Sequence, residues 1–136
     1  MRDIAYLALG SNVGDRAGYL AAAREALARL PQSRVLAVSS ADETAPLGGA
    51  ATGIFLNQMI ALETELSPRA LLDAIHMIER DSGRERTIRW GDRTLDIDIV
   101  RFAHQQVHEP DLQVPHPELP NRDFWQRELA ELERMP

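Results

Sequence analysis

Residues 55–83 decide the order of elements in this protein, and they read FLNQMIALETELSPRALLDAIHMIERDSG. The first part, residues 55–66, contains Phe, Ile and Leu but no Gly or Pro, which predicts a long strand. Ser67 and Pro68 then supply a helix N-cap and a first-turn proline. Because apolar side chains recur at helical spacing from there to Gly83, we expect a helix directly after the strand.

The segments on either side extend this unit to four strands and two helices. Residues 4–9 are mostly apolar and predict a buried strand, residues 15–30 carry apolar side chains at helical spacing, and residues 35–39 predict a short strand. Residues 94–102 are again strand-like. This order predicts an α+β protein of the ferredoxin-like βαββαβ type, with a four-stranded antiparallel sheet and helices on one face. Many activities use this fold, so it does not identify one.

The other segments are expected to be loops and a tail. Residues 42–53 contain one proline and three glycines, which predicts a mobile loop. The end of the chain is polar and proline-rich, and becomes weakly helical from about Asp123. The 136 residues contain no repeat or linker, so we expect a single domain over residues 1–136, with a short C-terminal tail from about residue 125.

The composition excludes several classes of function. There is no cysteine, which excludes disulfides, thiolate zinc sites and a cysteine nucleophile. No apolar run approaches the roughly 20 residues that cross a bilayer, and no signal peptide is evident, so we expect a cytoplasmic protein. The net charge of -6 argues against general nucleic-acid binding. All 15 basic residues are arginine, so any phosphate must be bound by arginine, backbone amides or a metal rather than by a Gly-Lys phosphate loop.

Two carboxylates share one face of the last predicted strand, whose start reads TLDIDI at residues 94–99. Side chains on a strand alternate between faces, so Asp96 and Asp98 lie together and the apolar residues lie opposite. Acids about 7 Å apart repel each other unless a cation is bound, and Mg²⁺ commonly takes one or two carboxylates together with substrate phosphates. A solvent-facing strand edge with two acids fits the same pattern.

An arginine cluster precedes these acids. Arg84, Arg86, Arg89 and Arg93 lie within ten residues that also contain Trp90. The planar guanidinium binds phosphate oxygens in pairs, and glycines at the ends of such a segment let it close over a ligand. Alone, the cluster also fits a solvated loop. Its position next to the two acids favours a nucleotide polyphosphate site.

Four further residues are weaker candidates. His116 has the chemistry to donate a hydrogen bond to a phosphate, although a lone histidine is more often structural. Phe55 and Phe124 suit stacking on a flat aromatic ligand, although phenylalanine is more often in the core. Asn57, on the same strand face as Phe55, offers the paired donor and acceptor that the edge of a heterocycle needs.

Together these segments resemble the family of 6-hydroxymethyl-7,8-dihydropterin pyrophosphokinases. The strongest motif is RWGDRTLDID at residues 89–98, which is similar to the family's Arg-Trp-Gly-x-Arg-Thr-Leu-Asp-hydrophobic-Asp signature. The other motifs are LGSN at 9–12 with GDR at 14–16, ETAPLG at 43–48, FLN at 55–57, and VPHP at 114–117 with RDF at 122–124. The resemblance implies transfer of diphosphate from ATP to the pterin hydroxymethyl group in folate biosynthesis, with AMP as leaving group.

The resemblance also implies roles for individual residues. It implies two Mg²⁺ ions at Asp96 and Asp98, with ATP as co-substrate. The implied catalytic residues are Arg84, Arg86, Arg93, Asp96 and Asp98. Contacts to ATP are implied for His76, Glu79, Arg84, Arg86, Arg89, Trp90, Arg93, His116 and Arg122. Contacts to the pterin are implied for Thr44, Pro46, Leu47, Phe55, Asn57, Trp90, Asp96 and Phe124. We expect a monomer with small-molecule substrates and neither nucleic acid nor membrane as partner.

Some positions depart from the family pattern. His76 stands where a glutamine can serve the nucleotide, and Asp111 stands where an arginine can help to bind it. After Phe124 the chain reads WQREL instead of a Pro-Leu-x-Glu-Ile-Ala-Pro-like tail. Asp111 and the tail leave open a catalytically weak relative that acts as a nucleotide- or pterin-binding module. A ferredoxin-like interaction domain without a ligand is a third hypothesis.

Overall fold

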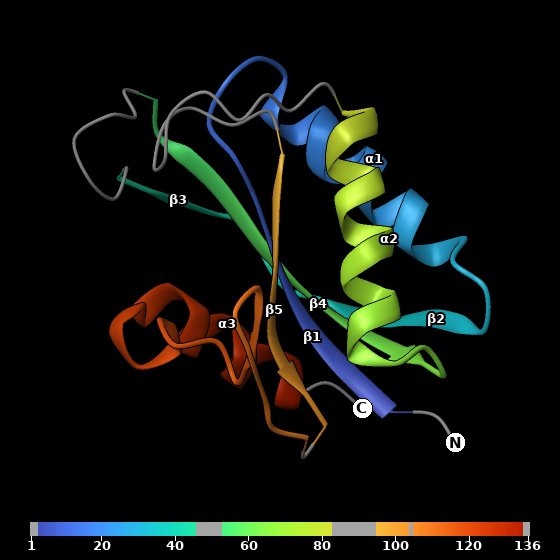
Figure 1. The fold of residues 1–136 in the computed structure, drawn as a ribbon. Coiled ribbons are helices and arrows are strands. Elements are labelled where there is room, and N and C mark those ends of the chain that lie inside the picture. The colour runs from blue at the N-terminus through green and yellow to red at the C-terminus, as the bar shows by residue number, and fades with distance from the viewer. Residues whose placement is uncertain (1–2, 46–52, 83–94, 104, 135–136) are drawn as a thin grey trace.

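The computed structural model describes residues 3–45, 53–82, 95–103 and 105–134 (Figure 1). Eleven elements follow one another along this part of the chain. They are β1 (Asp3–Ser11), α1 (Arg16–Ala28), β2 (Ser33–Val38), β3 (Asp42–Thr44), β4 (Phe55–Thr64), α2 (Pro68–Asp81), β5 (Asp96–Phe102), β6 (Val107–Glu109), β7 (Leu112–Val114), the 3₁₀ helix η1 (Leu119–Asn121) and α3 (Asp123–Glu133).

The main sheet is antiparallel, and four of its strands follow the order β2-β4-β1-β5. β1 and β2 both pair with β4, so they are parallel to each other and separated by one strand. In the same way, β4 and β5 lie on either side of β1. This is the split arrangement of two crossover units. The predicted α+β class and antiparallel sheet are therefore confirmed.

The predicted number of strands is wrong, because the sheet has five. The fifth strand is β3, which pairs with the first three residues of β4 and lies within the segment 42–53 that was expected to be a loop. β6 and β7 form a separate two-stranded hairpin that the sequence also did not reveal. Each of these strands has only three residues, which is too short for an alternating hydrophobic pattern to be recognised.

The prediction that the helices cover only one face of the sheet is also wrong. α1 and α2 pack on one face, whereas α3 packs on the other (Figure 1). The period-two alternation of β1 serves both layers, since Leu7 and Leu9 face α1 and α2 and Ala8 faces α3. On the second face, the buried apolar side chains are Ala8, Met59, Ala61, Val100, Trp125, Leu129 and Leu132.

Local signals at the ends of the helices explain where they begin. The Asp15 side chain accepts a hydrogen bond from the Gly18 N–H at 3.1 Å, and the Ser67 hydroxyl accepts one from the Ala70 N–H at 3.1 Å. Pro68 occupies the first turn of α2, as the sequence predicted. Within the described residues, no helix combines the length and apolar character that a membrane span requires.

Candidate active site

The two acids of β5 lie on the same face of the sheet. Ile97 and Ile99 are buried against α1 and α2, while Asp96 and Asp98 alternate with them and stay partly exposed. The Asp side chains therefore share the face that α3 covers further along the sheet. The prediction that both carboxylates project from one side of this strand is confirmed.

A glycine separates Asp96 from the candidate pterin-binding residues. In the sheet register, Gly10 of β1 pairs with Asp96 on one side and with Asn57 on the other. A Cβ atom at residue 10 would lie 3.3 Å from Asn57 Oδ1 and 3.5 Å from Phe55 Cδ1. Such a methyl group would crowd both side chains. The glycine therefore leaves open the space above residue 10, between the side chains of Asp96 and Asn57.

The amide of Asn57 is held in one orientation by β3. Its Nδ2 group donates to the Thr44 hydroxyl at 2.7 Å and to the Asp42 carbonyl at 3.4 Å, and the residue is almost fully buried. These bonds place Oδ1 next to Gly10. The pairing of β3 with β4 thus brings two of the predicted pterin-binding residues, Thr44 and Asn57, into contact.

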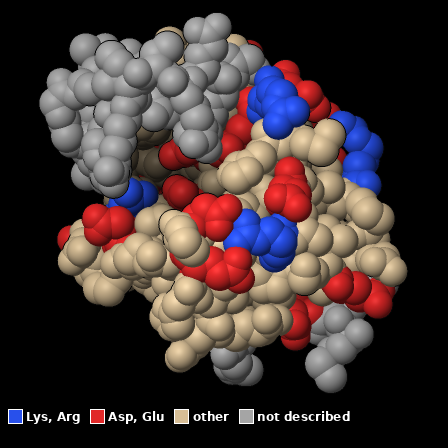
Figure 2. Space-filling model, viewed as in Figure 1, with Lys and Arg blue, Asp and Glu red and all other residues tan. Residues whose placement is uncertain are grey.

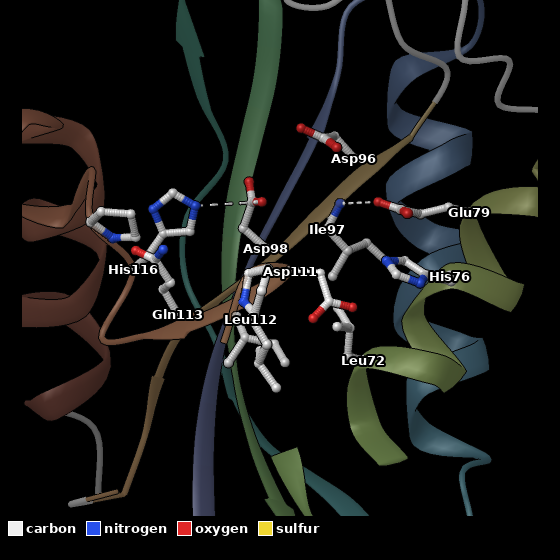
Figure 3. A pocket seen from close by; sticks show the side chains of 13 residues that line it. Leu72, His76, Glu79, Asp96, Ile97, Asp98, Asp111, Leu112, Gln113 and His116 are labelled. Carbon is white, nitrogen blue, oxygen red and sulfur yellow. Dashed lines mark hydrogen bonds and ion pairs between the residues drawn. The ribbon is translucent and has the colours of Figure 1, made fainter. Parts of the chain in front are cut away.

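A cleft of about 360 Å³ lies between α2, β5 and the β6–β7 hairpin (Figure 3). Its polar lining includes His76, Glu79, Asp96, Asp98, Asp111 and His116. Five of these are residues that the family resemblance implies for ATP or metal binding, and they come from segments up to 40 residues apart in the sequence (116 minus 76). Figure 2 shows acidic side chains gathered around a hollow in this face, with basic side chains between them.

His116 is a neutral imidazole with a defined tautomer. Burial, and then the nearby Arg122 cation, lower the pKa of His116 below its usual value of 6.5. Its Nδ1 atom accepts a hydrogen bond from the Glu118 N–H at 3.0 Å, so the proton of the neutral ring is on Nε2. Nε2 lies 3.8 Å from Asp98 Oδ1, which is longer than a hydrogen bond (Figure 3).

Trp125 orients the groups around His116. Its indole meets the His116 ring edge to face, with centroids 4.9 Å apart, and the guanidinium carbon of Arg122 lies 4.3 Å from the centroid of the indole. The Phe124 ring lies 6.2 Å from it. Sequence reasoning treated Trp125 only as part of an altered tail. The signal for its role was its spacing of three residues from Arg122 at the start of a predicted helix.

Glu79 connects α2 to the strand that carries the acids. Its side chain is only 4 % exposed, and Oε2 accepts a hydrogen bond from the backbone N–H of Ile97 at 2.9 Å (Figure 3). Ile97 lies between Asp96 and Asp98, so this bond fixes the part of β5 that carries the two carboxylates. The ATP contact that the resemblance implies for Glu79 stays a prediction beside this backbone contact.

Asp111 is engaged by an arginine. Its carboxylate forms a two-pronged contact with Arg69 of α2, with Nη1 to Oδ2 at 2.7 Å and Nη2 to Oδ1 at 2.9 Å. Arg69 also binds Glu109. The hydrogen bonds from Arg69 hold the pKa of Asp111 below its usual value. The acid that departs from the family pattern therefore lies at the cleft as one half of an ion pair.

Two aromatic candidates lie in described elements, whereas seven other candidates do not. Phe55 begins β4, and Phe124 lies in the first turn of α3 against the apolar cluster on that face. Their stacking on a pterin stays a prediction. Seven other candidates lie outside the described residues, namely Pro46, Leu47, Arg84, Arg86, Arg89, Trp90 and Arg93.

Comparison with known proteins gives one consistent family. A family model described as 7,8-dihydro-6-hydroxymethylpterin-pyrophosphokinase matches residues 6–134. The chain is 45 % identical over 127 residues to the 2-amino-4-hydroxy-6-hydroxymethyldihydropteridine pyrophosphokinase of Pseudomonas aeruginosa, covering 93 % of this chain and 78 % of the relative. It is 44 % identical over 135 residues to the protein of that name in Bacillus subtilis, covering 97 % and 79 %. For the Methylorubrum extorquens protein of the same name, identity is 44 % over 128 residues, covering 94 % and 81 %.

Proposed function

The chain belongs to the 7,8-dihydro-6-hydroxymethylpterin-pyrophosphokinase family and is a pyrophosphokinase of folate biosynthesis, and we propose that it uses ATP with Mg²⁺ held at Asp96 and Asp98. The acceptor is the hydroxymethyl group of 6-hydroxymethyl-7,8-dihydropterin. The single observation that carries the proposal is the presence of both carboxylates on one face of β5, at a cleft large enough for a nucleotide's phosphates.

The donor set at this site suits magnesium. Asp96 and Asp98 supply oxygen ligands only, and Mg²⁺ characteristically takes one or two carboxylates and completes its shell with water and substrate phosphates. Among the described residues, no group of three or more His, Asp or Glu side chains forms a ready-made metal site. We propose that substrate phosphates would complete the ligand set. Two ions are proposed from the family resemblance. When bound, Mg²⁺ neutralises charge on the phosphates.

The proposed step is an in-line displacement at the β-phosphorus of ATP. The pterin hydroxymethyl oxygen forms a bond to this phosphorus, and the bond from the β-phosphorus to the oxygen that bridges the α- and β-phosphates breaks. AMP departs with that oxygen, and the hydroxyl proton passes to solvent water. No protein nucleophile is needed, because such transfers depend on positioning and on compensation of charge. His116 donates from Nε2 and Arg122 supplies positive charge beside it.

The pterin is proposed to lie over Gly10 and Asn57, where the glycine leaves space above the sheet. Asn57 is held by Thr44, so its carbonyl oxygen presents a fixed acceptor to a heterocycle edge. Phe55, on the same side of β4, offers one stacking surface, and Phe124 is proposed as the other. The hydroxymethyl group would then point toward Asp96, which pairs with Gly10 across the sheet.

Two observations disfavour a catalytically weak binding module. Asp111 is paired with Arg69 rather than presented to phosphate alone. The altered tail forms α3, whose Trp125 contacts His116 and Arg122 and whose Leu129 and Leu132 cover the sheet. Both departures from the family pattern are therefore accommodated in the fold.

The test is AMP release from ATP and Mg²⁺ in the presence and absence of the hydroxymethyl dihydropterin, together with calorimetric binding of α,β-methylene-ATP. Pterin-dependent AMP formation that EDTA abolishes supports the proposal. Binding of the analogue without AMP formation would support the module instead. Absence of binding by either ligand would support an interaction domain.

A further inference from the structure

We propose that Arg69 is a positioning residue for the nucleotide. It acts through Asp111, which lines the cleft, and through Glu109, which lies two residues before Asp111, holding both carboxylates in ion pairs so that they do not repel a bound triphosphate. The inference rests on the proposed function in one respect, namely that the cleft receives the phosphates of ATP. It concerns affinity for the nucleotide and not the chemical step.

The geometry is that of a specific ion-pair network. Arg69 lies at the second residue of α2, Glu109 ends β6, and Asp111 lies in the turn before β7. Both terminal guanidinium nitrogens of Arg69 engage Asp111, Nη1 at 2.7 Å and Nη2 at 2.9 Å, and Nη2 also engages Glu109. Among exposed ion pairs, two-pronged contacts and shared networks have the best-defined geometry and the strongest interaction between the charges.

The network is not what holds the hairpin in place. Leu112 and Val114 of β7 are buried in the main core, at 5 % and 0 % exposure. Immediately after β7, the His116 backbone N–H donates to the Val100 carbonyl at 2.9 Å, which ties the chain to β5. Arg69 and its partners are largely exposed, so their contribution to folding is small. Their effect is therefore expected on the charge of the cleft.

The part of the cleft lining that the structure describes is rich in acids. Its four acidic residues are Glu79, Asp96, Asp98 and Asp111, and the pKa of His116 is lowered by burial, which favours the neutral ring. Figure 3 shows Asp111 beside His76, across the cleft from His116. Mg²⁺ is proposed to compensate Asp96 and Asp98, and Glu79 is bonded to the strand backbone. Asp111 is the acid of this lining that Arg69 contacts directly, so we assign the compensation of its charge to Arg69.

The direct test replaces Arg69 by Met, which keeps the aliphatic part of the side chain. Kd for α,β-methylene-ATP with Mg²⁺ is expected to rise about three- to tenfold at low salt, because two acids are left uncompensated. KM for ATP should rise by the same factor with kcat unchanged. The matched control is Arg34→Met, which removes an exposed arginine paired with Glu63 at the far edge of the sheet and should leave Kd unchanged.

Rescue separates charge compensation from a packing role. Adding Glu109→Gln and Asp111→Asn to Arg69→Met should lower Kd again, to the value of the unaltered protein or below it. In 0.5 M NaCl the difference between Arg69→Met and the unaltered protein should shrink, because exposed charges are screened. A weak affinity that persists in the triple variant, and at high salt, would overturn the inference.

A second variant keeps the test decisive if Arg69→Met folds poorly. Glu109→Gln with Asp111→Asn leaves Arg69 in place and unmatched, so the analogue should bind about threefold more tightly. Unchanged or weaker binding contradicts the inference. If the unaltered chain binds the analogue but releases no AMP, the proposed function fails while these affinities still decide the role of Arg69. If the unaltered chain is active and Arg69→Met has an unchanged Kd, only the inference fails.

Discussion

The Nε2 atom of His116 lies 3.8 Å from Oδ1 of Asp98, while Nδ1 of the same ring is occupied by the Glu118 backbone N–H. A neutral donor is therefore aimed at an acid without being locked to it by a hydrogen bond. In the proposed site for phosphate and Mg²⁺, such a pair would present a proton donor and an anionic ligand side by side. Protonation of the ring would turn the same contact into an ion pair that competes with the cation.

Replacing Asp98 by Ala should abolish most of the activity. Loss of a magnesium ligand is expected to lower kcat/KM about a thousandfold or more, which corresponds to several kcal/mol of transition-state stabilisation. The melting temperature should change little, since one of two neighbouring carboxylates is removed. AMP release and thermal unfolding measure the two effects. The control is Asp73→Ala, an exposed acid of α2, and full activity in Asp98→Ala would refute the metal assignment.

Replacing His116 by Phe should lower kcat/KM about ten- to a hundredfold, because a hydrogen bond to a charged phosphate is lost. His116→Gln keeps a side-chain donor and should retain more activity than the Phe variant. The pKa of His116 is below 6.5, so an acid limb of the pH-rate profile below that value should be present in the unaltered protein and missing in the Gln variant. Equal losses in both variants, with the acid limb intact, would assign the ring a packing role.

Glu128 should make the fold less stable as the pH rises. This residue of α3 is only 1 % exposed, and burial followed by the carboxylate of Asp42 raises its pKa to about 8 from a usual 4.5. Between these two values the folded state holds a proton that the unfolded state has released. The free energy of unfolding should therefore fall as the pH rises from about 4.5 to about 8.

Glu128→Gln removes this titration, so the variant should be more stable than the unaltered protein at pH 8 and show a flatter profile. Urea unfolding at a series of pH values measures both. An exposed acid of the same helix, replaced in Glu133→Gln, serves as the control. Identical pH profiles for Glu128→Gln and the unaltered protein would contradict the assignment of the buried proton to Glu128.

Gly10→Ala should weaken pterin binding more than nucleotide binding. The added Cβ would lie 3.3 Å from Asn57 Oδ1, so either the Asn57 amide must shift or the pterin must bind farther from the sheet. We expect about a tenfold increase in Kd for the pterin and less than a twofold change for α,β-methylene-ATP. Calorimetry with each ligand checks this difference. Equal changes for both ligands would argue against the proposed position of the pterin.

Regular patterns made much of this fold predictable from the sequence. The alternation in β5 correctly placed Asp96 and Asp98 on one face, and the Ser67 and Pro68 signals correctly marked the start of α2. β3 and the β6–β7 hairpin were missed because three-residue strands carry no recognisable period. The sequence analysis predicted only a weakly helical tail after residue 125. Trp125, Leu129 and Leu132 do repeat at helical spacing, but the charged residues between them hide this apolar face in the sequence.

The candidate site was predictable where its residues form a local motif and unpredictable where they meet through the fold. The strand pattern supplied Asp98, and imidazole chemistry together with the family resemblance supplied His116, but neither pointed to the indole of Trp125 that contacts the histidine. The pairing of Arg69 with Asp111 joins residues 42 apart in the sequence, and no spacing rule connects a helix start with a hairpin turn. From the sequence alone, Asp111 is therefore interpreted as a charge that disfavours triphosphate binding, whereas the structure shows its ion pair with Arg69.

The position of α3 links the maturation of this protein to its chemistry. The helix seals the apolar half of a sheet face whose other half carries the acids, and it also brings Trp125 against His116 and Arg122. A nascent chain that has already formed the sheet still lacks a fixed donor beside Asp98 until α3 docks. Molecules clipped before α3 would therefore lack the Trp125 contacts to His116 and Arg122, and we expect their activity to be reduced.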